Sequence, residues 1–163
     1  MRKINLLLSI ILLLSLTACS SNAIMNQSIF YYPRPVPQYN DSNGVIGSEK
    51  TAQTISNRSD FEIIQLYLDG PNSQDLCSPL SEHTELLSVT KDANSIVFIF
   101  TNSIAEINPT LLTPSLVALA KTCFEIYDIN EIRIQAESVL LNTEQEIIIN
   151  KDNVFLWDSS VQN

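Results

Sequence analysis

An apolar run from Leu6 to Leu16 divides this chain into a leader and a part that can fold. The run follows a short basic head, Arg2-Lys3, and it ends just before two small residues and Cys19. This order of basic, apolar and small residues is typical of a secretory signal. The run is also shorter than the roughly 20 residues that a transmembrane helix needs. We therefore expect residues 1–18 to be removed and to take no part in the fold.

The segment Leu16-Thr17-Ala18-Cys19 resembles a bacterial lipobox, whose cysteine receives a diacylglyceryl group and becomes the first mature residue. The thiol of Cys19 is a nucleophile for lipid transfer when it is partly deprotonated. Two or three acyl chains make a durable anchor, since each buried methylene contributes about 0.8 kcal/mol. The sequence thus predicts lipid attachment at Cys19, with the protein held at the extracytoplasmic face of the cell membrane. The alternatives are an uncleaved apolar anchor, or an ordinary signal in which the cysteine has no role.

Composition excludes several classes of function. The chain has 163 residues and a formal net charge of −9, which becomes −11 once Arg2 and Lys3 are removed with the leader. Its length predicts one domain, and its acidity disfavours a nucleic-acid partner. A single histidine disfavours a His-rich metal site, and the three glycines match no nucleotide-binding loop. The acidic domain is repelled by anionic lipid surfaces, so we expect its anchor alone to hold it at the membrane.

Turn and capping signals predict two strands, a helix, two strands, a second helix, a strand and a closing hairpin. This order predicts the α+β class, with two helices on one face of a mainly antiparallel sheet. The expected strands cover residues 30–32, 45–55, 86–90, 95–101, 131–135, 147–149 and 154–157.

The first expected helix has the clearest start and stop signals. Ser59 and Glu62 have the spacing of a capping box, and Gly70-Pro71 supplies a left-handed stop followed by a residue that cannot continue the helix. Its expected buried stripe consists of Phe61, Ile64, Tyr67 and Leu68.

Thr113-Pro114 predicts the start of the second helix, with Thr113 as cap and Pro114 at the first position. The stripe expected to be buried on this helix consists of Leu116, Leu119, Ala120, Cys123 and Phe124. Residues 96–100 are apolar on both strand faces, which predicts a central strand.

Three segments in the middle of the chain resemble the core of the GerMN domain, which is named from sporulation and spore-germination lipoproteins. They are Leu66-Tyr67-Leu68-Asp69-Gly70-Pro71, Leu76-Cys77-Ser78-Pro79-Leu80 and Thr84-Glu85-Leu86-Leu87-Ser88. Ala118-Leu119-Ala120-Lys121-Thr122 is similar to a helix of that family, Glu131-Ile132-Arg133-Ile134 to its next strand, and residues 30–46 to its opening hairpin. The chain departs from the family pattern at Ser81 and His83, where members often have proline and glycine.

This resemblance covers residues 29–158, which leaves residues 19–28 as a tether. It implies a compact domain similar to the ring-building motifs of secretion and sporulation machinery. Such domains act through protein contacts in the cell envelope, in sporulation, germination or envelope assembly. The family brings no catalytic or cofactor-binding residues, so none is expected here.

Several side chains are candidates for chemistry. The carboxylates Asp69, Asp75, Glu82 and Glu85 gather around one loop, but they lack calcium-loop spacing, so a solvated acidic loop is expected. His83 is expected to be an exposed loop residue, because no triad pattern surrounds it. Cys77 and Cys123 either form a disulfide or remain two inert thiols.

Three functions stay open at this point. The favoured one is a lipid-anchored, non-enzymatic envelope domain that acts on a protein partner and needs no metal, cofactor or small-molecule substrate. The second is a ligand- or glycan-binding lipoprotein with a concave aromatic site built from Tyr31, Tyr32 and Tyr39. The third is an envelope hydrolase, which needs a cleft with paired carboxylates of unequal pKa.

Overall fold

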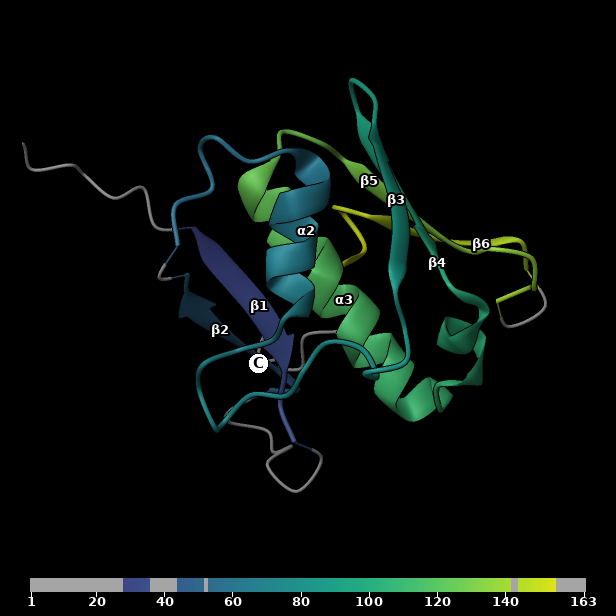
Figure 1. Cartoon of the computed structure of the whole chain (residues 1–163), viewed down its shortest axis with the longest axis horizontal. Coiled ribbons are helices and arrows are strands. Elements are labelled where there is room, and N and C mark those ends of the chain that lie inside the picture. Colours follow the sequence, from purple (N-terminus) through teal and green to yellow (C-terminus); the bar gives the residue numbers. More distant parts are fainter. Residues whose placement is uncertain (1–27, 36–43, 52, 142–143, 155–163) are drawn as a thin grey trace, which may run out of the picture.

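A computed structural model describes residues 28–35, 44–51, 53–141 and 144–154 of the chain. Cys19, Tyr39 and residues 155–157 therefore lie outside the described residues. The fold is α+β, as predicted (Figure 1). Its elements are β1 (Ile29–Pro33), β2 (Ile46–Lys50), α2 (Asp60–Leu68), β3 (Leu86–Lys91), β4 (Ser95–Phe100), the 3₁₀ helix η2 (Asn102–Glu106), α3 (Pro109–Ile126), β5 (Glu131–Ala136) and β6 (Glu146–Asn150).

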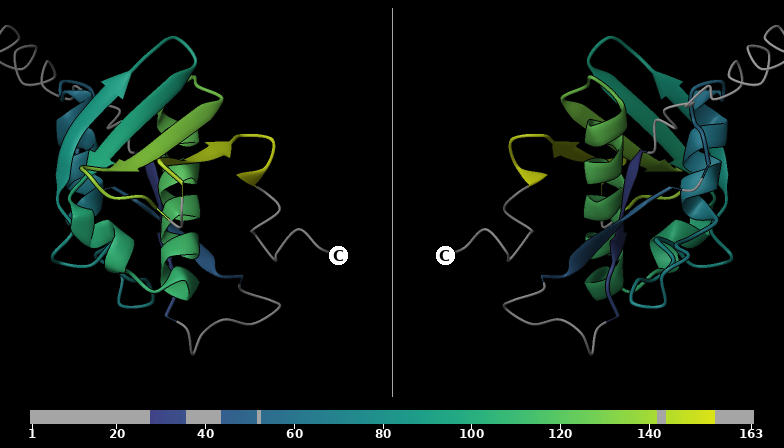
Figure 2. Two further views of the ribbon diagram at one scale, coloured as in Figure 1. Left: turned by 90° about the vertical axis from the view of Figure 1, so that its right-hand side faces the viewer. Right: turned by 90° about the vertical axis from the view of Figure 1, so that its left-hand side faces the viewer.

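The strands form two sheets. Strands β3, β4, β5 and β6 lie in that order in a four-stranded sheet, in which only the β4–β5 pair is parallel. Helix α3 makes the crossover that a parallel pair requires. Strands β1 and β2 form a separate antiparallel hairpin. Figure 2 shows α2 and α3 on one face of the larger sheet, with this hairpin on the other side of the helices.

The core lies between the helices and the four-stranded sheet. The central strand predicted at residues 96–100 is confirmed, since β4 lies between β3 and β5. Ile96, Phe98 and Phe100 are fully buried, and Val97 and Ile99 are half-buried. Ile132 and Ile134 of β5 are also fully buried on the same face. On α3 the predicted stripe is buried apart from Phe124, which is half-buried.

Helix α2 begins with the predicted capping box. Ser59 Oγ accepts a hydrogen bond from the Glu62 N–H, and the Glu62 carboxylate accepts one from the Ser59 N–H at 2.8 Å. Gly70 follows the helix in the left-handed conformation, with φ +96°. The predicted burial of Phe61 is wrong, because its side chain is 39% exposed. The buried face of this short helix is centred on Ile63, Ile64 and Tyr67.

Helix α3 begins at Pro109, five residues before Pro114. The side chain of Asn108 accepts a hydrogen bond of 2.9 Å from the Thr110 N–H, and Pro109 occupies the first helical turn. Thr113 is therefore not the cap. Asn108-Pro109 carries the same two start signals as Thr113-Pro114, and the earlier pair begins the helix. Pro114 lies inside the helix.

Both ends of the described domain differ from the prediction in detail. The second strand is shorter than expected and ends at Lys50. The Thr51 hydroxyl that follows accepts a hydrogen bond of 3.1 Å from the Gln53 N–H. The strand predicted at 147–149 is confirmed as β6. Val154, predicted to begin the next strand, is buried in a 3₁₀ turn instead. Within the described ranges, every helix is too short or too polar to cross a membrane.

Candidate functional site

The acidic loop between α2 and β3 does not assemble a carboxylate site. Asp69, Asp75, Glu82 and Glu85 are all exposed. Glu82 and Glu85 line a shallow hollow of about 200 Å³, whereas Asp69 lines a different one of about 240 Å³. Among residues 28–35, 44–51, 53–141 and 144–154, no three His, Cys, Asp or Glu side chains are grouped as a metal site.

The polar groups of this loop hold its own backbone. Ser78 Oγ donates a hydrogen bond of 3.1 Å to the Leu80 carbonyl. His83 is exposed, as predicted, and its carbonyl accepts a hydrogen bond of 2.7 Å from Ser103 Oγ. These contacts fix the path of the chain and do not bring a nucleophile to a base.

Glu49 attaches the same loop to the β1–β2 hairpin. Its carboxylate accepts hydrogen bonds from the N–H groups of Asn72 at 3.0 Å and Ser73 at 3.1 Å. The segment that follows Gly70-Pro71 is thereby tied to β2. Sequence reasoning missed this contact, because Asn72 and Ser73 lie 23 and 24 residues after Glu49 in the chain. No local sequence pattern marks Glu49 as their partner.

The tyrosines proposed for ligand binding do not share a site among the described residues. Tyr32 is 1% exposed, its ring stacks on that of Tyr67 at 4.9 Å, and its hydroxyl donates to the Tyr67 carbonyl at 3.2 Å. Burial, with smaller contributions from the charges of Glu49 and Asp69, raises the pKa of Tyr32 above its ordinary value. Tyr31 is half-buried, with Lys121 Nζ 4.9 Å from its ring centroid. Tyr32 is therefore part of the core and not of a binding surface.

Both described cysteines are free thiols. Cys123 is fully buried on α3, and burial raises the pKa of its thiol. Cys77 is half-buried. The structure thus favours the two-thiol alternative over the disulfide.

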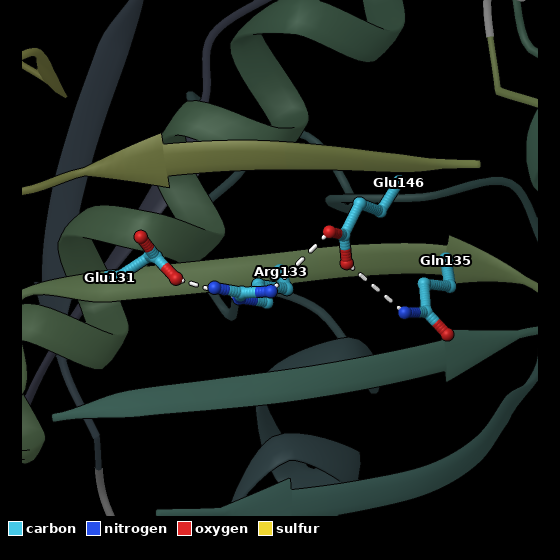
Figure 3. Close-up of polar contacts among 4 residues, drawn as sticks. All are labelled: Glu131, Arg133, Gln135 and Glu146. Atoms are coloured by element: carbon cyan, nitrogen blue, oxygen red, sulfur yellow. Dashed lines mark hydrogen bonds and ion pairs between the residues drawn. The ribbon is translucent and has the colours of Figure 1, made fainter. Parts of the chain in front are cut away.

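The face of the four-stranded sheet turned away from the helices carries a polar network (Figure 3). Arg133 Nε lies 2.7 Å from Glu131 Oε1, and Arg133 Nη1 lies 3.4 Å from Glu146 Oε1. Gln135 Nε2 donates to Glu146 Oε2 at 3.1 Å. The hydrogen bond to Glu131, followed by the charges of Glu131 and Glu146, raises the pKa of Arg133. The two carboxylates are engaged with Arg133, an arrangement that stabilises charge and does not suit acid–base chemistry.

A larger apolar hollow, which we call the α3–β6 groove, lies between α3 and β6. Its volume is about 530 Å³, more than twice that of either loop hollow. Most of its walls are aliphatic, with Leu112, Leu116 and Val117 from α3, Leu141 from the loop before β6, and Ile147 and Ile149 from β6. This volume is within the range of about 300–1,000 Å³ found for binding pockets.

Within the part of the chain that the structure describes, strand β6 is an open edge of the sheet beside this groove. Among the described residues it pairs with β5 alone. Edge strands present unpaired N–H and C=O groups, which natural proteins protect with proline, lysine or a covering segment. β6 contains neither proline nor lysine, and its central Ile148 is 45% exposed. The groove and this edge together form the candidate functional site.

The sequence predicted β6 but not the groove. The apolar run Ile147-Ile148-Ile149 predicts a strand. Ile147 and Ile149 lie opposite the buried Ile134 and Ile132, whereas Ile148 lies opposite Arg133, on the face that carries the polar network. The groove itself depends on where α3 lies relative to β6, and no local pattern carries that information.

Comparisons with known proteins leave the family of this chain open. Neither a family model nor a curated protein matches it. A crystal structure of a candidate lipoprotein from Clostridium perfringens overlaps 86% of this chain and 99% of that one, with 17% identity and a TM-score of 0.47. The GerMN resemblance stays a prediction from the sequence.

Proposed function

We propose that this chain is a lipid-anchored envelope domain that acts by protein contact, attached through Cys19 and docking a partner at the α3–β6 groove. Its position is the extracytoplasmic face of the cell membrane. The GerMN resemblance adds the setting of the contact, which is sporulation, germination or envelope assembly. The role is non-catalytic in this proposal.

The leader and its cysteine support the anchor. Residues 20–28 are small and polar over most of their length and precede β1, which begins at Ile29. A fully extended chain spans about 3.3–3.6 Å per residue, so this tether keeps the domain within about 30 Å of the bilayer. The partner must accordingly be in, on or next to the same membrane.

The observation that carries the contact role is the open edge of β6 above an aliphatic groove. A strand added to such an edge gains main-chain hydrogen bonds, and alternate side chains enter the groove beneath. The carboxylates, thiols and tyrosines described above support the non-catalytic role, because they are either dispersed or bonded to neighbouring groups. The partner expected here is an extended segment with large apolar side chains.

Lipid attachment is tested by Cys19→Ala in cells fed a labelled fatty acid. The proposal expects the wild-type protein to carry label and to sediment with membranes. The variant should lose the label and be released or misprocessed. Equal labelling and fractionation of the two proteins would contradict the anchor.

Contact at the edge of β6 is tested with a photoreactive amino acid placed at Ile148 in intact cells. Leu87 is the matched control, because it is 42% exposed and lies on β3, the opposite edge of the same sheet. We expect discrete adducts from position 148 that disappear when Cys19→Ala is combined with it, and none from position 87. Adducts of equal yield at both positions would contradict a specific site.

A further inference from the structure

We propose that the partner at the β6 edge is a second copy of this chain, whose own β6 pairs with it antiparallel about Ile148. This choice of partner rests on the proposed function, because it concerns the same edge. The segment expected there is extended and carries large apolar side chains. Strand β6 is itself such a segment, since Ile147, Ile148 and Ile149 form its centre.

The sequence of β6 is self-complementary. A two-fold axis normal to the sheet at Ile148 places this residue opposite its own copy, Ile147 opposite Ile149, and Glu146 opposite Asn150. Each apolar side chain then meets an apolar one, at the separation of about 4.5–5.5 Å between Cβ atoms that directly opposite residues have. Ile148, which is 45% exposed in the single copy, lies at the centre of this contact.

The charges of β6 permit this pairing. Glu146 is the one charged residue of the strand, and it would face the neutral side chain of Asn150. Like charges directly opposite each other destabilise a strand pair, and this register brings none together. Within each copy, the Glu146 carboxylate already lies 3.4 Å from Arg133 Nη1 and accepts a hydrogen bond of 3.1 Å from Gln135 (Figure 3). Two acidic domains can therefore meet at this edge without adding an uncompensated charge.

The contact is short, because the chain turns away after the strand. Residues 151–153 form a turn, and the Lys151 N–H donates to the Asn130 carbonyl of its own copy at 2.8 Å. Pairing thus comprises the five residues of β6, fewer than the roughly 20–30 residues a side of a standard interface. We expect weak association in dilute solution and stronger association at the membrane, where the anchors confine both copies and raise their effective concentration.

The other edge of the sheet is protected against such pairing. The register of β3 shifts between Leu86 and Ser88, and the strand ends at Lys91. Lys91 Nζ lies 3.7 Å from Asp60 Oδ1 at the start of α2, which packs against this strand. Bulges, lysines and covering helices are the devices that keep an edge from pairing. Self-pairing is accordingly expected at β6 and not at β3.

Introduced cysteines test the pairing and its centre. The lipidated chain is placed in phosphatidylcholine vesicles and treated with a short bis-methanethiosulfonate crosslinker. Cys77→Ser removes the half-buried thiol from every sample, and Cys123 stays because it is fully buried. Ile148→Cys should give covalent dimers at about five-fold higher yield than Leu87→Cys on β3. Equal yields from the two positions would overturn the proposal.

The register is tested with two further positions. An equal mixture of Glu146→Cys and Asn150→Cys chains should crosslink between copies, because the two residues are opposite each other. Glu146→Cys alone should not, since its two copies are four residues, or about 13 Å, apart along the pair. Crosslinking of Glu146→Cys alone as strongly as the mixture would overturn the register centred on Ile148.

Charge exchange at Ile148 separates pairing from damage to the fold. Ile148→Lys and Ile148→Glu each place like charges opposite each other at the two-fold axis. Each should raise the dissociation constant about ten-fold, measured by energy transfer between donor- and acceptor-labelled chains in the same vesicles. An equal mixture of the two variants should recover the transfer, which a folding defect would not allow. A mixture no tighter than the single variants would overturn the proposal.

Photocrosslinking from Ile148 in intact cells distinguishes this proposal from the proposed function. Adducts of twice the mass of the chain support both. Adducts with a different protein, and none with a second copy, would overturn self-pairing and leave the contact function standing. The lack of any adduct would contradict both.

Discussion

The side-chain hydroxyl of Thr122 on α3 bridges the two backbone groups of Tyr31 on β1. It accepts a hydrogen bond of 2.9 Å from the Tyr31 N–H and donates one of 3.4 Å to the Tyr31 carbonyl. Thr122 is fully buried, and it ends the segment Ala118–Thr122 in which the GerMN resemblance was noted. One hydroxyl thus takes the place of a neighbouring strand and fixes the β1–β2 hairpin to the helix layer.

Thr122→Val should destabilise the domain by about 1–3 kcal/mol, because the isosteric change leaves backbone groups of Tyr31 without their partner. Urea unfolding measures the free energy. Thr122→Ser keeps the hydroxyl and should retain most of the stability. If valine proves as stable as threonine, the hydroxyl bridge contributes nothing.

Gly70→Val should lower stability by about 1 kcal/mol or more, since a β-branched residue resists the left-handed conformation. The cost is conformational, because a Cβ added at Gly70 meets nothing closer than Ser78 at 3.9 Å. Gly70→Asn should cost less than valine, as asparagine tolerates this region better. An unchanged melting temperature for Gly70→Val would show that the left-handed stop does not matter.

The domain should lose stability in acid as Glu62 becomes protonated. The backbone hydrogen bond from Ser59, and then that from its hydroxyl, lowers the pKa of Glu62 below the ordinary value of 4.5. A lowered folded-state pKa gives stability that is complete above the ordinary value and is lost as the pH falls through the folded value. Glu62→Gln should flatten the dependence of unfolding free energy on pH below about 4.5. Glu82→Gln removes one charge from the exposed loop, and an equal flattening there would contradict the role of the cap.

Glu49→Gln should loosen the loop after Gly70, because a neutral amide is a weaker acceptor for the N–H groups of Asn72 and Ser73. Hydrogen exchange should quicken at these two amides and stay unchanged in β4 and β5. Uniform acceleration throughout the domain would mean that Glu49 acts on global stability and not on this loop.

The features predicted correctly are those that depend on residues close together in the chain. Ser59 and Glu62 meet within one turn of helix, and Ile96, Phe98 and Phe100 alternate within one strand, so neither needs the rest of the fold. The predicted start of α3 is too late, because Asn108-Pro109 and Thr113-Pro114 carry the same start signal. Local chemistry does not say which of the two pairs begins the helix.

The features that sequence reasoning missed depend on distant parts of the chain. The alternative of a ligand-binding lipoprotein needs Tyr32 on a binding surface, but its ring packs on Tyr67, which is 35 residues away. The separate β1–β2 sheet follows from a contact between β1 and α3 that spans 91 residues. The α3–β6 groove is long-range in the same sense. Such contacts are set by the packing of whole elements, which no periodicity in the sequence encodes.

Mass spectrometry of the native polypeptide tests the central claim most directly, because the anchor decides where the groove and its partner meet. The account predicts a chain that begins at Cys19, with a diacylglyceryl group on its sulfur and an acyl group on its amine. A chain that retains Met1 and has an unmodified thiol at Cys19 would contradict it.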